Sequence, residues 1–326
     1  MESILVAGGA GYVGSHACKA LARAGYQPVT LDNLRTGHAD AVKWGPLIEA
    51  DIRDEDVVRA AVRQYGVSSA MHFAASSLVA ESMAKPELYY DINVIATLRF
   101  LEALSAEGIR QIVFSSSAAV YGAVEAGLIS EDTPLSPTNT YGETKRVIEG
   151  ALQWMGAAKG FSWVALRYFN AAGADPDGEI GERHDPETHL IPNLIRSALG
   201  TGPGLKLFGD DYPTPDGSVV RDYVHVTDLA DAHVAALRYL KAGGASRPFN
   251  LGSGVGLSVL EVVKAAETAL GQPVKYEMAG RRAGDPPRLV ADPSAAMAAF
   301  DWKPGRSDPA TLIRTAAAFE ASRPPR

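Results

Sequence analysis

Gly8-Gly9-Ala10-Gly11-Tyr12-Val13-Gly14 follows an apolar run at residues 3–7 and precedes an alanine-rich stretch at residues 15–24. A glycine turn between a strand and a helix lets the backbone approach a pyrophosphate closely, and the helix N-terminus adds partial positive charge. The turn therefore predicts a dinucleotide site. Its backbone contacts would come from Gly8, Gly11, Tyr12, Val13 and Gly14.

A carboxylate follows at the spacing that such a site requires. Asp32 ends the next apolar run, eighteen residues after Gly14, where roughly 20 are expected. Its carboxylate would bond the adenosine ribose hydroxyls and repel a 2′-phosphate, so we expect NAD rather than NADP, with Asn33 beside it. After the third predicted strand, Asp51 and Ile52 would flank the adenine, although Asp51 is equally suited to cap the next helix.

The first half of the chain alternates short apolar runs with stretches of helical, 3.6-residue periodicity. Such an alternation predicts an α/β fold with a Rossmann-type, doubly wound parallel sheet. Ligands of such sheets bind outside the carboxyl ends of the strands. We expect strands at residues 3–7, 28–31, 47–49, 70–73, 111–115 and 163–167, and helices at residues 15–24, 54–65, 89–106 and 141–159.

The second half is patterned differently. Residues 175–186 and 200–222 are rich in glycine, proline and acidic residues, which predicts long ordered loops. A periodic helix at residues 227–241 and a strand at residues 248–251 are expected to return to the sheet. The remainder, including a helix at residues 258–270, predicts a second, smaller mixed α/β substrate lobe that covers the cleft.

Length and composition limit the possible classes of protein. A chain of 326 residues is natural as two domains, here residues 1–170 with a returning segment near 225–252, and residues 171–326. The net charge of -7 argues against nucleic-acid binding. The single cysteine, Cys18, excludes an intrachain disulfide and a cysteine-based metal cluster, and we expect no metal. Without a visible signal peptide or membrane span, we expect a cytoplasmic enzyme with no membrane partner.

Three residues have the chemistry for moving a proton. Tyr141 and Lys145 are four residues apart and would share a helix face, while Ser117 closes the fifth predicted strand. The lysine charge is expected to lower the tyrosine pKa from roughly 10, so that the phenol can exchange protons near neutral pH. Together with the dinucleotide site, this predicts oxidation of an alcohol.

The serine and the Tyr-x-x-x-Lys pattern resemble the extended short-chain dehydrogenase superfamily. Over nearly the whole chain the sequence is similar to the UDP-glucose 4-epimerases. The similar segments are Ala7 to His16, Asp32-Asn33-Leu34, His72-Phe73-Ala74-Ala75, Tyr89-Tyr90-Asp91-Ile92-Asn93, Phe114 to Gly122, Leu166 to Gly173, Arg221 to Val226 and Arg281-Arg282-Ala283-Gly284-Asp285.

The resemblance implies reversible, NAD-dependent 4-epimerisation of a UDP-sugar, UDP-glucose or UDP-galactose, through a 4-keto intermediate. Ser117, Tyr141 and Lys145 would be the catalytic residues. The resemblance adds to the cofactor site Phe73, Ala74, Ala75, Asn93, Ser115, Tyr141, Lys145 and Tyr168. The implied substrate site comprises Ser117, Tyr141, Asn170, His189, Leu190, Phe208, Arg221, Arg282, Asp285 and Leu289. It further implies a homodimer that pairs through residues 89–106 and 141–159.

Three positions depart from the family pattern. Ser77 stands where many members have a lysine for the cofactor phosphates, and His189 stands where relatives often have asparagine. Leu289 replaces a bulky tyrosine, so N-acetylated hexoses are alternative substrates, and UDP-pentoses are a further alternative. Ala118-Ala119 replaces the acid/base pair of a 4,6-dehydratase, which argues against that reaction, and Asp32 disfavours an NADPH-dependent reductase. A catalytically silent NAD-sensing regulator is an alternative from another class of protein. Such a protein would be expected to have lost part of the catalytic set, whereas Ser117, Tyr141 and Lys145 are all present.

Overall fold

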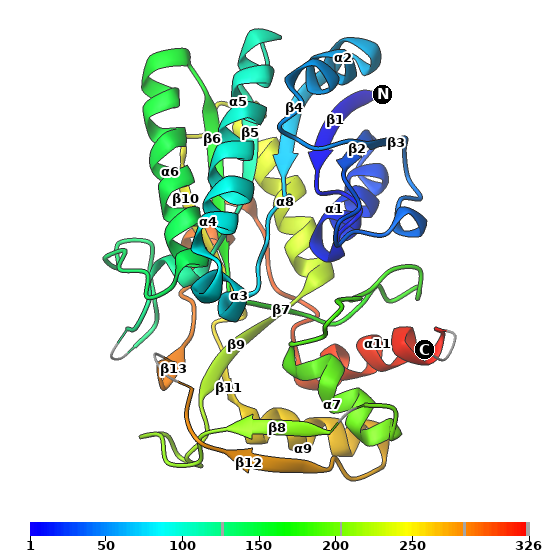
Figure 1. Ribbon diagram of the computed structural model, residues 1–326, viewed down its shortest axis with the longest axis vertical. Helices are drawn as coiled ribbons and strands as arrows, with labels where there is room; N and C mark the ends of the chain where they lie inside the picture. The colour runs from blue at the N-terminus through cyan, green and yellow to red at the C-terminus, as the bar shows by residue number, and fades with distance from the viewer. Residues whose placement is uncertain (125–126, 203, 283–284, 324–326) are drawn as a thin grey trace.

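The computed structural model of the protein describes residues 1–124, 127–202, 204–282 and 285–323. A large sheet with helices on both faces forms the upper part of the molecule, and a smaller group of strands and helices lies below it (Figure 1). Among the described residues, no helix is both long and apolar enough to cross a membrane.

The main sheet has seven parallel strands in the order β10-β6-β5-β4-β1-β2-β3. Because β1 is followed in space by β2 on one side and β4 on the other, the strand order reverses there, and a crevice opens at the carboxyl ends of these two strands. The strands are β1 (Glu2–Ala7), β2 (Tyr26–Asp32), β3 (Leu47–Glu49), β4 (Val67–His72), β5 (Gln111–Ser117), β6 (Ser162–Tyr168) and β10 (Arg247–Leu251).

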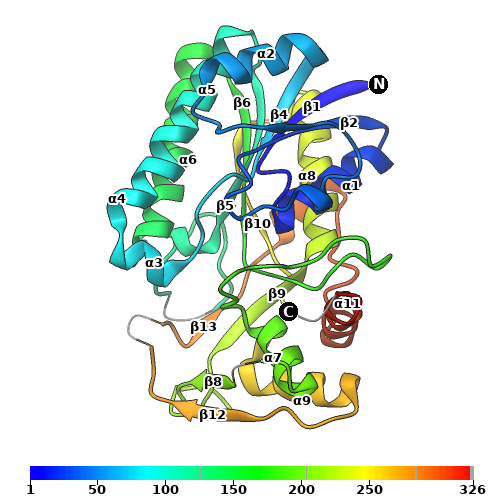
Figure 2. The same cartoon turned by 45° about the vertical axis from the view of Figure 1, so that its right-hand side comes forward.

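Two hydrophobic cores cover the faces of this sheet, as Figure 2 shows with the sheet between its helices. One face packs on α2 (Glu55–Tyr65), α5 (Ala96–Ala106) and α6 (Thr140–Lys159). The other packs on α1 (Tyr12–Arg23), α8 (Val226–Lys241) and α10 (Ser294–Phe300). Since both faces are covered, strands such as β1 are buried along almost their whole length rather than at alternate residues.

Short helical segments connect these elements. They are η1 (Ala39–Ala41), α3 (Val79–Ala84), α4 (Pro86–Tyr89), the π-helical η2 (Tyr90–Ile95) and η3 (Ala118–Val120). The expected helix at residues 89–106 is therefore real but divided, with a π-helical turn before α5.

The smaller lobe is built around β9 (Val220–His225), which pairs with β7 (Asn170–Ala172), β11 (Gly256–Ser258) and β13 (Arg288–Leu289). A second, two-stranded sheet pairs β8 (Leu205–Phe208) with β12 (Tyr276–Ala279). Helices α7 (Leu190–Leu199), α9 (Val259–Leu270) and α11 (Pro309–Ala321) pack against these strands in a core of their own.

The predicted fold class is confirmed, including the return of α8 and β10 to the main sheet. The prediction of a loop over residues 200–222 is wrong in part, because β8 and the start of β9 lie within it. β8 alternates buried and exposed residues over only four positions, and its partner β12 comes from far along the chain. Such a strand is too short to stand out from its glycine- and proline-rich surroundings.

Candidate active site

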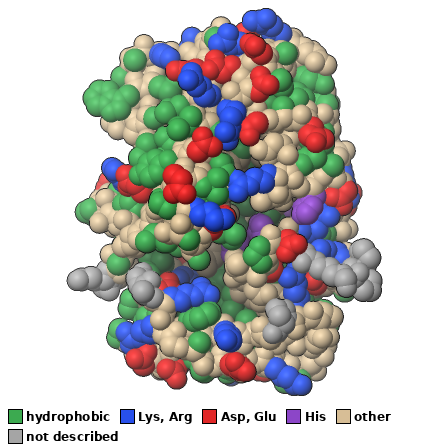
Figure 3. All heavy atoms as spheres, in the orientation of Figure 1, with side chains coloured by type: hydrophobic (Ala, Val, Ile, Leu, Met, Phe, Trp, Pro, Cys, Tyr) green, Lys and Arg blue, Asp and Glu red, His purple; other side chains and the backbone are tan. Residues whose placement is uncertain are grey.

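One cavity of about 1150 Å³ lies between the carboxyl ends of the main sheet and the smaller lobe. Its lining runs from Gly8 at the glycine turn, past Tyr141, to Arg282 and Leu289 in the lobe. Figure 3 shows the groove between the two parts from outside, with histidine side chains at its edge. The predicted residues that line it are Gly8, Gly11, Tyr12, Val13, Gly14, Asp32, Asn33, Asp51, Ile52, Phe73, Ala74, Ala75, Ser115, Ser117, Tyr141, Lys145, Tyr168, Asn170, His189, Leu190, Arg282, Asp285 and Leu289.

The glycine turn brings backbone N–H groups to this cavity. Gly8 has a positive φ of 80°, and Gly11 is the N-cap of α1 without a side-chain cap, so the first amides of the helix have no side-chain acceptor. A Cβ added at Gly14 would lie 2.1 Å from the Gly8 carbonyl oxygen, which shows how tightly the helix packs on the turn. The uncapped helix start with no acidic residue in its first turn fits the pyrophosphate of a dinucleotide.

Asp32 ends β2 beside this turn. Its Oδ2 accepts the Ala10 N–H at 3.0 Å and its Oδ1 accepts the Leu34 N–H at 2.9 Å, so the carboxylate is fixed in orientation. Burial raises the pKa of Asp32, and these two N–H groups oppose that rise. Each oxygen keeps a lone pair for a ribose hydroxyl, which fits the adenosine half of NAD.

Asp51 lines the cavity but does not cap a helix. Its Oδ2 accepts from Asn33 Nδ2 at 3.0 Å and its Oδ1 accepts from the Arg53 N–H at 3.0 Å. The N-cap of α2 is Asp54, whose side chain accepts from the Val57 N–H at 3.2 Å. The alternative role considered for Asp51 as an N-cap is therefore wrong.

Ser117, Tyr141 and Lys145 come together on one wall of the cavity. Ser117 is the last residue of β5, and its Oγ accepts the Ala119 N–H at 3.1 Å. Tyr141 and Lys145 lie in the first turns of α6, which Asn139 caps by accepting the Gly142 N–H at 2.8 Å. A phenol, a hydroxyl and an ammonium in this arrangement can exchange a proton with an alcohol held against them.

The prediction that the charge of Lys145 lowers the pKa of Tyr141 is wrong. Burial raises the pKa of Tyr141, and the Ser117 side chain opposes this rise only in part. The Lys145 Nζ is 5.8 Å from the centre of the Tyr141 ring and donates to the Ser115 carbonyl oxygen at 2.8 Å. Burial also lowers the pKa of Lys145 to about 7 against the nearby charge of Glu149, so this ammonium is itself partly neutral at pH 7.

Asn93 does not line the cavity. Its Oδ1 accepts the Ser76 N–H at 2.8 Å, while its Nδ2 donates to Ser76 O at 3.0 Å and to Thr144 Oγ1 at 3.1 Å. Asn93 therefore holds the cavity wall at Ser76 from behind, and a direct contact of its remaining Oδ1 lone pair with the cofactor stays a prediction. The neighbouring Ser77 is exposed and lines the cavity.

Arg221 and Phe208 also stand behind the lining. Arg221 donates from Nη2 to Asp285 Oδ1 at 2.6 Å and from Nη1 to Pro286 O at 2.9 Å, so its fork holds the loop before β13. The Arg282 guanidinium lies 4.0 Å from the centre of the Phe208 ring. Arg282 and Asp285 therefore face the cavity, with Phe208 and Arg221 supporting them. Ala283 and Gly284 of the same motif lie outside the described residues.

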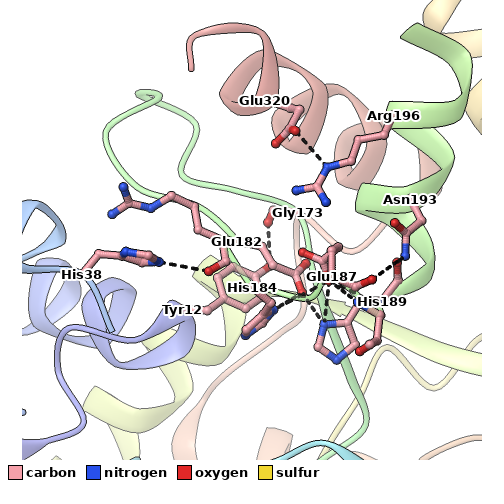
Figure 4. A network of polar contacts seen from close by, with 12 residues as sticks. Tyr12, His38, Gly173, Glu182, His184, Glu187, His189, Asn193, Arg196 and Glu320 are labelled. Carbon is pink, nitrogen blue, oxygen red and sulfur yellow. Dashed lines mark hydrogen bonds and ion pairs between the residues drawn. The ribbon is translucent and has the colours of Figure 1, made fainter. Parts of the chain in front are cut away.

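Residue His189 belongs to a network that the sequence did not predict (Figure 4). The Nδ1 atoms of His184 and His189 both face the same oxygen, Glu182 Oε1. The His184 Nδ1 lies 3.1 Å from that oxygen. Glu187 Oε1 lies 3.6 Å from the His189 Nδ1 and 3.8 Å from the His184 Nδ1. The four residues come from eight consecutive positions, and their Glu-x-His-x-x-Glu-x-His spacing is the sequence signal that could have found them.

Other lining residues were also missed. Arg35, whose Nη1 lies 3.5 Å from Ser76 Oγ, brings a positive charge to the wall where Ser77 replaces the expected lysine. His38, labelled in Figure 4, donates from Nε2 to the Arg183 carbonyl oxygen at 3.0 Å, and the Arg183 guanidinium pairs with Asp40. These contacts join the loop after β2 to the loop before α7 across the cavity mouth.

Comparison with known proteins agrees with this geometry. The model of the NAD dependent epimerase/dehydratase family matches residues 4–252. A UDP-glucose 4-epimerase of Lacticaseibacillus casei is 49% identical over 315 residues, 96% of this chain and 95% of that protein. The crystal structure of UDP-glucose 4-epimerase from Brucella ovis in complex with NAD has a TM-score of 0.95 at 47% identity, covering 97% of this chain and 98% of that one. The UDP-Glc/GlcNAc 4-epimerase from Campylobacter jejuni has a TM-score of 0.86 at 38% identity, covering 99% and 100%. The chain therefore belongs to the NAD dependent epimerase/dehydratase family and, within it, to the UDP-glucose 4-epimerases.

Proposed function

We propose that this protein catalyses the reversible, NAD-dependent 4-epimerisation of a UDP-sugar, interconverting UDP-glucose and UDP-galactose through a 4-keto intermediate. The observation that carries the proposal is a continuous cavity of about 1150 Å³ from the glycine turn to Arg282, with Tyr141 between them. Pockets for one drug-sized ligand measure about 300–1,000 Å³. The larger cavity has room for a dinucleotide and a nucleotide sugar side by side.

NAD bound at the glycine turn would accept a hydride from C4 of the sugar and return it to the opposite face. Tyr141, as phenolate, takes the proton of the sugar 4-hydroxyl and gives it back when the alcohol reforms. Ser117 shares a hydrogen bond with the same oxygen. Lys145 holds a ribose hydroxyl with its remaining N–H groups, and only its protonated form, in a group whose pKa burial lowers to about 7, favours the phenolate. Because Tyr141 is half-buried in the cavity wall, proton transfer is partly shielded from bulk water.

The nucleotide sugar is held by the lobe side of the cavity. Arg282 donates paired hydrogen bonds to the diphosphate, for which a planar guanidinium is well suited. Asp285, fixed by Arg221 at 2.6 Å, accepts from the uridine ribose. Leu190 lines the uracil side, with Phe208 behind it supporting Arg282, while Asn170 and His189 contact the diphosphate and sugar.

Leu289 sets the range of sugars. It lies in β13, lines the cavity, and packs on the apolar cluster around Phe169. A leucine leaves more room than a tyrosine for a C2 acetamido group, and the Campylobacter jejuni neighbour is described as acting on both UDP-Glc and UDP-GlcNAc. We therefore expect UDP-N-acetylglucosamine as a second substrate.

The direct test is turnover of UDP-galactose by purified protein without added NAD, followed by NMR of the product. Formation of UDP-glucose, with NAD or NADH released when the protein is unfolded, is the expected result. A protein that binds NAD but turns over none of a panel of UDP-hexoses, UDP-N-acetylhexosamines and UDP-pentoses would favour the silent NAD-sensing regulator. Release of mainly NADP would contradict the role of Asp32.

The assembly is proposed as a homodimer. Large apolar side chains are exposed on one side of the main sheet, among them Trp154 at 77%, Ile95 at 53% and Tyr90 at 40%. They lie on α6 and η2, the side where hydrophobic side chains gather in Figure 3. Two copies pairing through α5 and α6 would cover them. Light scattering should give twice the mass of the chain, and Trp154→Glu should shift the protein toward the monomer.

Two further proposals concern organisation and location. The division into a cofactor domain, residues 1–170 with the segment near 225–252, and a substrate lobe, residues 171–326, is supported by their separate cores, except that α10 and Trp302 pack in the core of the main sheet. The cytoplasm is the proposed location, and the buried free thiol of Cys18 suits a reducing compartment.

A further inference from the structure

Four ligand atoms converge at the start of α7. Glu182, His184, Glu187 and His189 each present a carboxylate oxygen or an imidazole nitrogen, and these four atoms lie within 4.8 Å of one another. All four side chains point toward a common centre between Tyr12 and α7 (Figure 4). The carboxylates are deep, with side-chain exposures of 7% for Glu182 and 2% for Glu187.

The spacing of these atoms is that of a four-coordinate metal site. Zinc binds imidazole nitrogen and carboxylate oxygen at about 2.0–2.2 Å in a tetrahedron, so neighbouring ligand atoms lie about 3.3 Å apart. Here the nitrogen-to-oxygen distances are 3.1 Å, 3.6 Å and 3.8 Å, and the pair of His189 with Glu182 is closer. Since all four atoms lie within 4.8 Å of one another, modest side-chain rotations would bring them onto a single ion.

The negative charges of Glu182 and Glu187 also lack the usual basic partners in the ranges that the structure describes. No lysine or arginine pairs with Glu182 or Glu187 among the described residues, and the buried Oε2 of Glu187 has no hydrogen-bond partner. A nearby acidic group of the same kind, Asp175 with Asp177 and Glu179, is neutralised by Lys19, whose Nζ lies 2.7 Å from each carboxylate. In the described part of the chain, the two glutamates therefore have only the His184 and His189 imidazoles as possible cationic partners, and two buried carboxylates so placed favour a cation between them.

We propose that Glu182, His184, Glu187 and His189 form a closed binding site for a divalent transition metal of the zinc type. Two imidazoles and two carboxylates suit Zn²⁺, and four protein ligands leave no open position, which is typical of a structural rather than a catalytic metal. The ion would tie the segment before α7 to itself and fix the cavity wall next to Tyr12. Glu182, His184 and His189 line the cavity, but the metal proposal does not depend on the epimerase reaction.

The alternative to a bound metal ion is protonation of both histidines. Both imidazoles protonated would also balance two carboxylates, as a network of four hydrogen-bonded ions. A metal instead requires both Nδ1 atoms to be unprotonated, so Zn²⁺ would displace those protons. The two states differ in composition, and metal analysis distinguishes them directly.

The experiment uses the untagged, full-length protein dialysed against ZnCl₂ and then against metal-free buffer. We expect one Zn²⁺ per chain, a higher Tm with zinc than after chelation, and an X-ray absorption spectrum with two imidazole nitrogens and two oxygens at about 2.0–2.2 Å. Glu187→Gln and His184→Gln should each remove the bound zinc and the Tm difference. Asp177→Asn, which makes the same change of charge on the exposed neighbouring cluster, should keep both.

Zinc below stoichiometry in the parent protein, or equal zinc in the parent and in Glu187→Gln, would overturn the proposal. Should either variant fail to fold, the absorption spectrum of the parent decides alone, because a shell without two imidazoles also overturns it. Since all readouts are composition, coordination and Tm, a failed metal site and a failed epimerase assignment remain distinguishable.

Discussion

Gly11 and Gly14 belong to one motif, but the structure gives them different physical roles. A Cβ at Gly14 would lie 2.1 Å from the carbonyl oxygen of Gly8, about 1 Å inside the closest contact that real Cβ atoms make. A Cβ at Gly11 would meet its nearest neighbour, the same oxygen, at 3.4 Å. Gly14 is therefore required by the packing of α1 on the turn, whereas Gly11 is required only where a ligand approaches.

The substitution Gly14→Ala should lower the free energy of unfolding. Alanine gains up to about 1 kcal/mol in helix propensity over glycine, whereas forcing a methyl group against fixed backbone costs about 1–3 kcal/mol or more. We expect a net loss of about 1–2 kcal/mol in the cofactor-free protein, with weaker NAD binding. Gly11→Ala, at an N-cap that uses no side chain, should change stability by less than about 1 kcal/mol but still weaken NAD binding.

Urea unfolding of both variants and of the parent, all freed of dinucleotide, measures the free energy of unfolding. Titration of the same proteins with NAD measures the binding affinity. The reasoning is refuted if Gly14→Ala is as stable as the parent, or if Gly11→Ala is the less stable of the two. A Gly11→Ala protein that binds NAD with unchanged affinity would contradict the close backbone approach.

The remaining predictions concern the catalytic wall and its surroundings. Tyr141→Phe should keep NAD but lose about 10²–10⁴-fold or more in turnover, and near-normal turnover would exclude Tyr141 as the base. Leu289→Tyr should reduce activity on UDP-N-acetylglucosamine while most activity on UDP-galactose survives, and a parallel loss of both would contradict its role in sugar choice. In the folded chain the pKa of Lys145 is lowered to about 7, below roughly 10.4 when unfolded. Between these values the unfolded chain binds more protons, so this lysine makes the free energy of unfolding rise with pH. Lys145→Met should flatten that rise in denaturant titrations at pH 7 to 10, and an unchanged slope would show that Lys145 is not its source.

Local patterns in the sequence predicted those features that depend on local chemistry. The glycine turn, the carboxylate of Asp32 at the end of β2 and the proximity of Tyr141 to Lys145 all follow from strand, turn and helix geometry over a few residues. The parallel sheet follows from the alternation of strands and helices. The observed strand order is that of the predicted doubly wound sheet.

Features that depend on burial or on distant segments were not predictable in this way. Helical spacing places Lys145 near Tyr141 but does not reveal how far each side chain is removed from water, and this desolvation decides the direction of both pKa shifts. The sequence around Asn93 does not reveal that its amide bonds to Ser76 and Thr144. His184 carries no signal of its own and gains meaning only beside two buried glutamates.

The return of β10 to the edge of the main sheet has a consequence for biosynthesis. β6 ends at Tyr168, but its partner β10 begins only at Arg247, after much of the smaller lobe has been made. While residues 169–246 emerge from the ribosome, the edge of β6 carries unpaired N–H and C=O groups that can pair with another chain. Aggregation during synthesis is therefore expected to be most sensitive to changes that delay α8 and β10, even where the finished protein is stable.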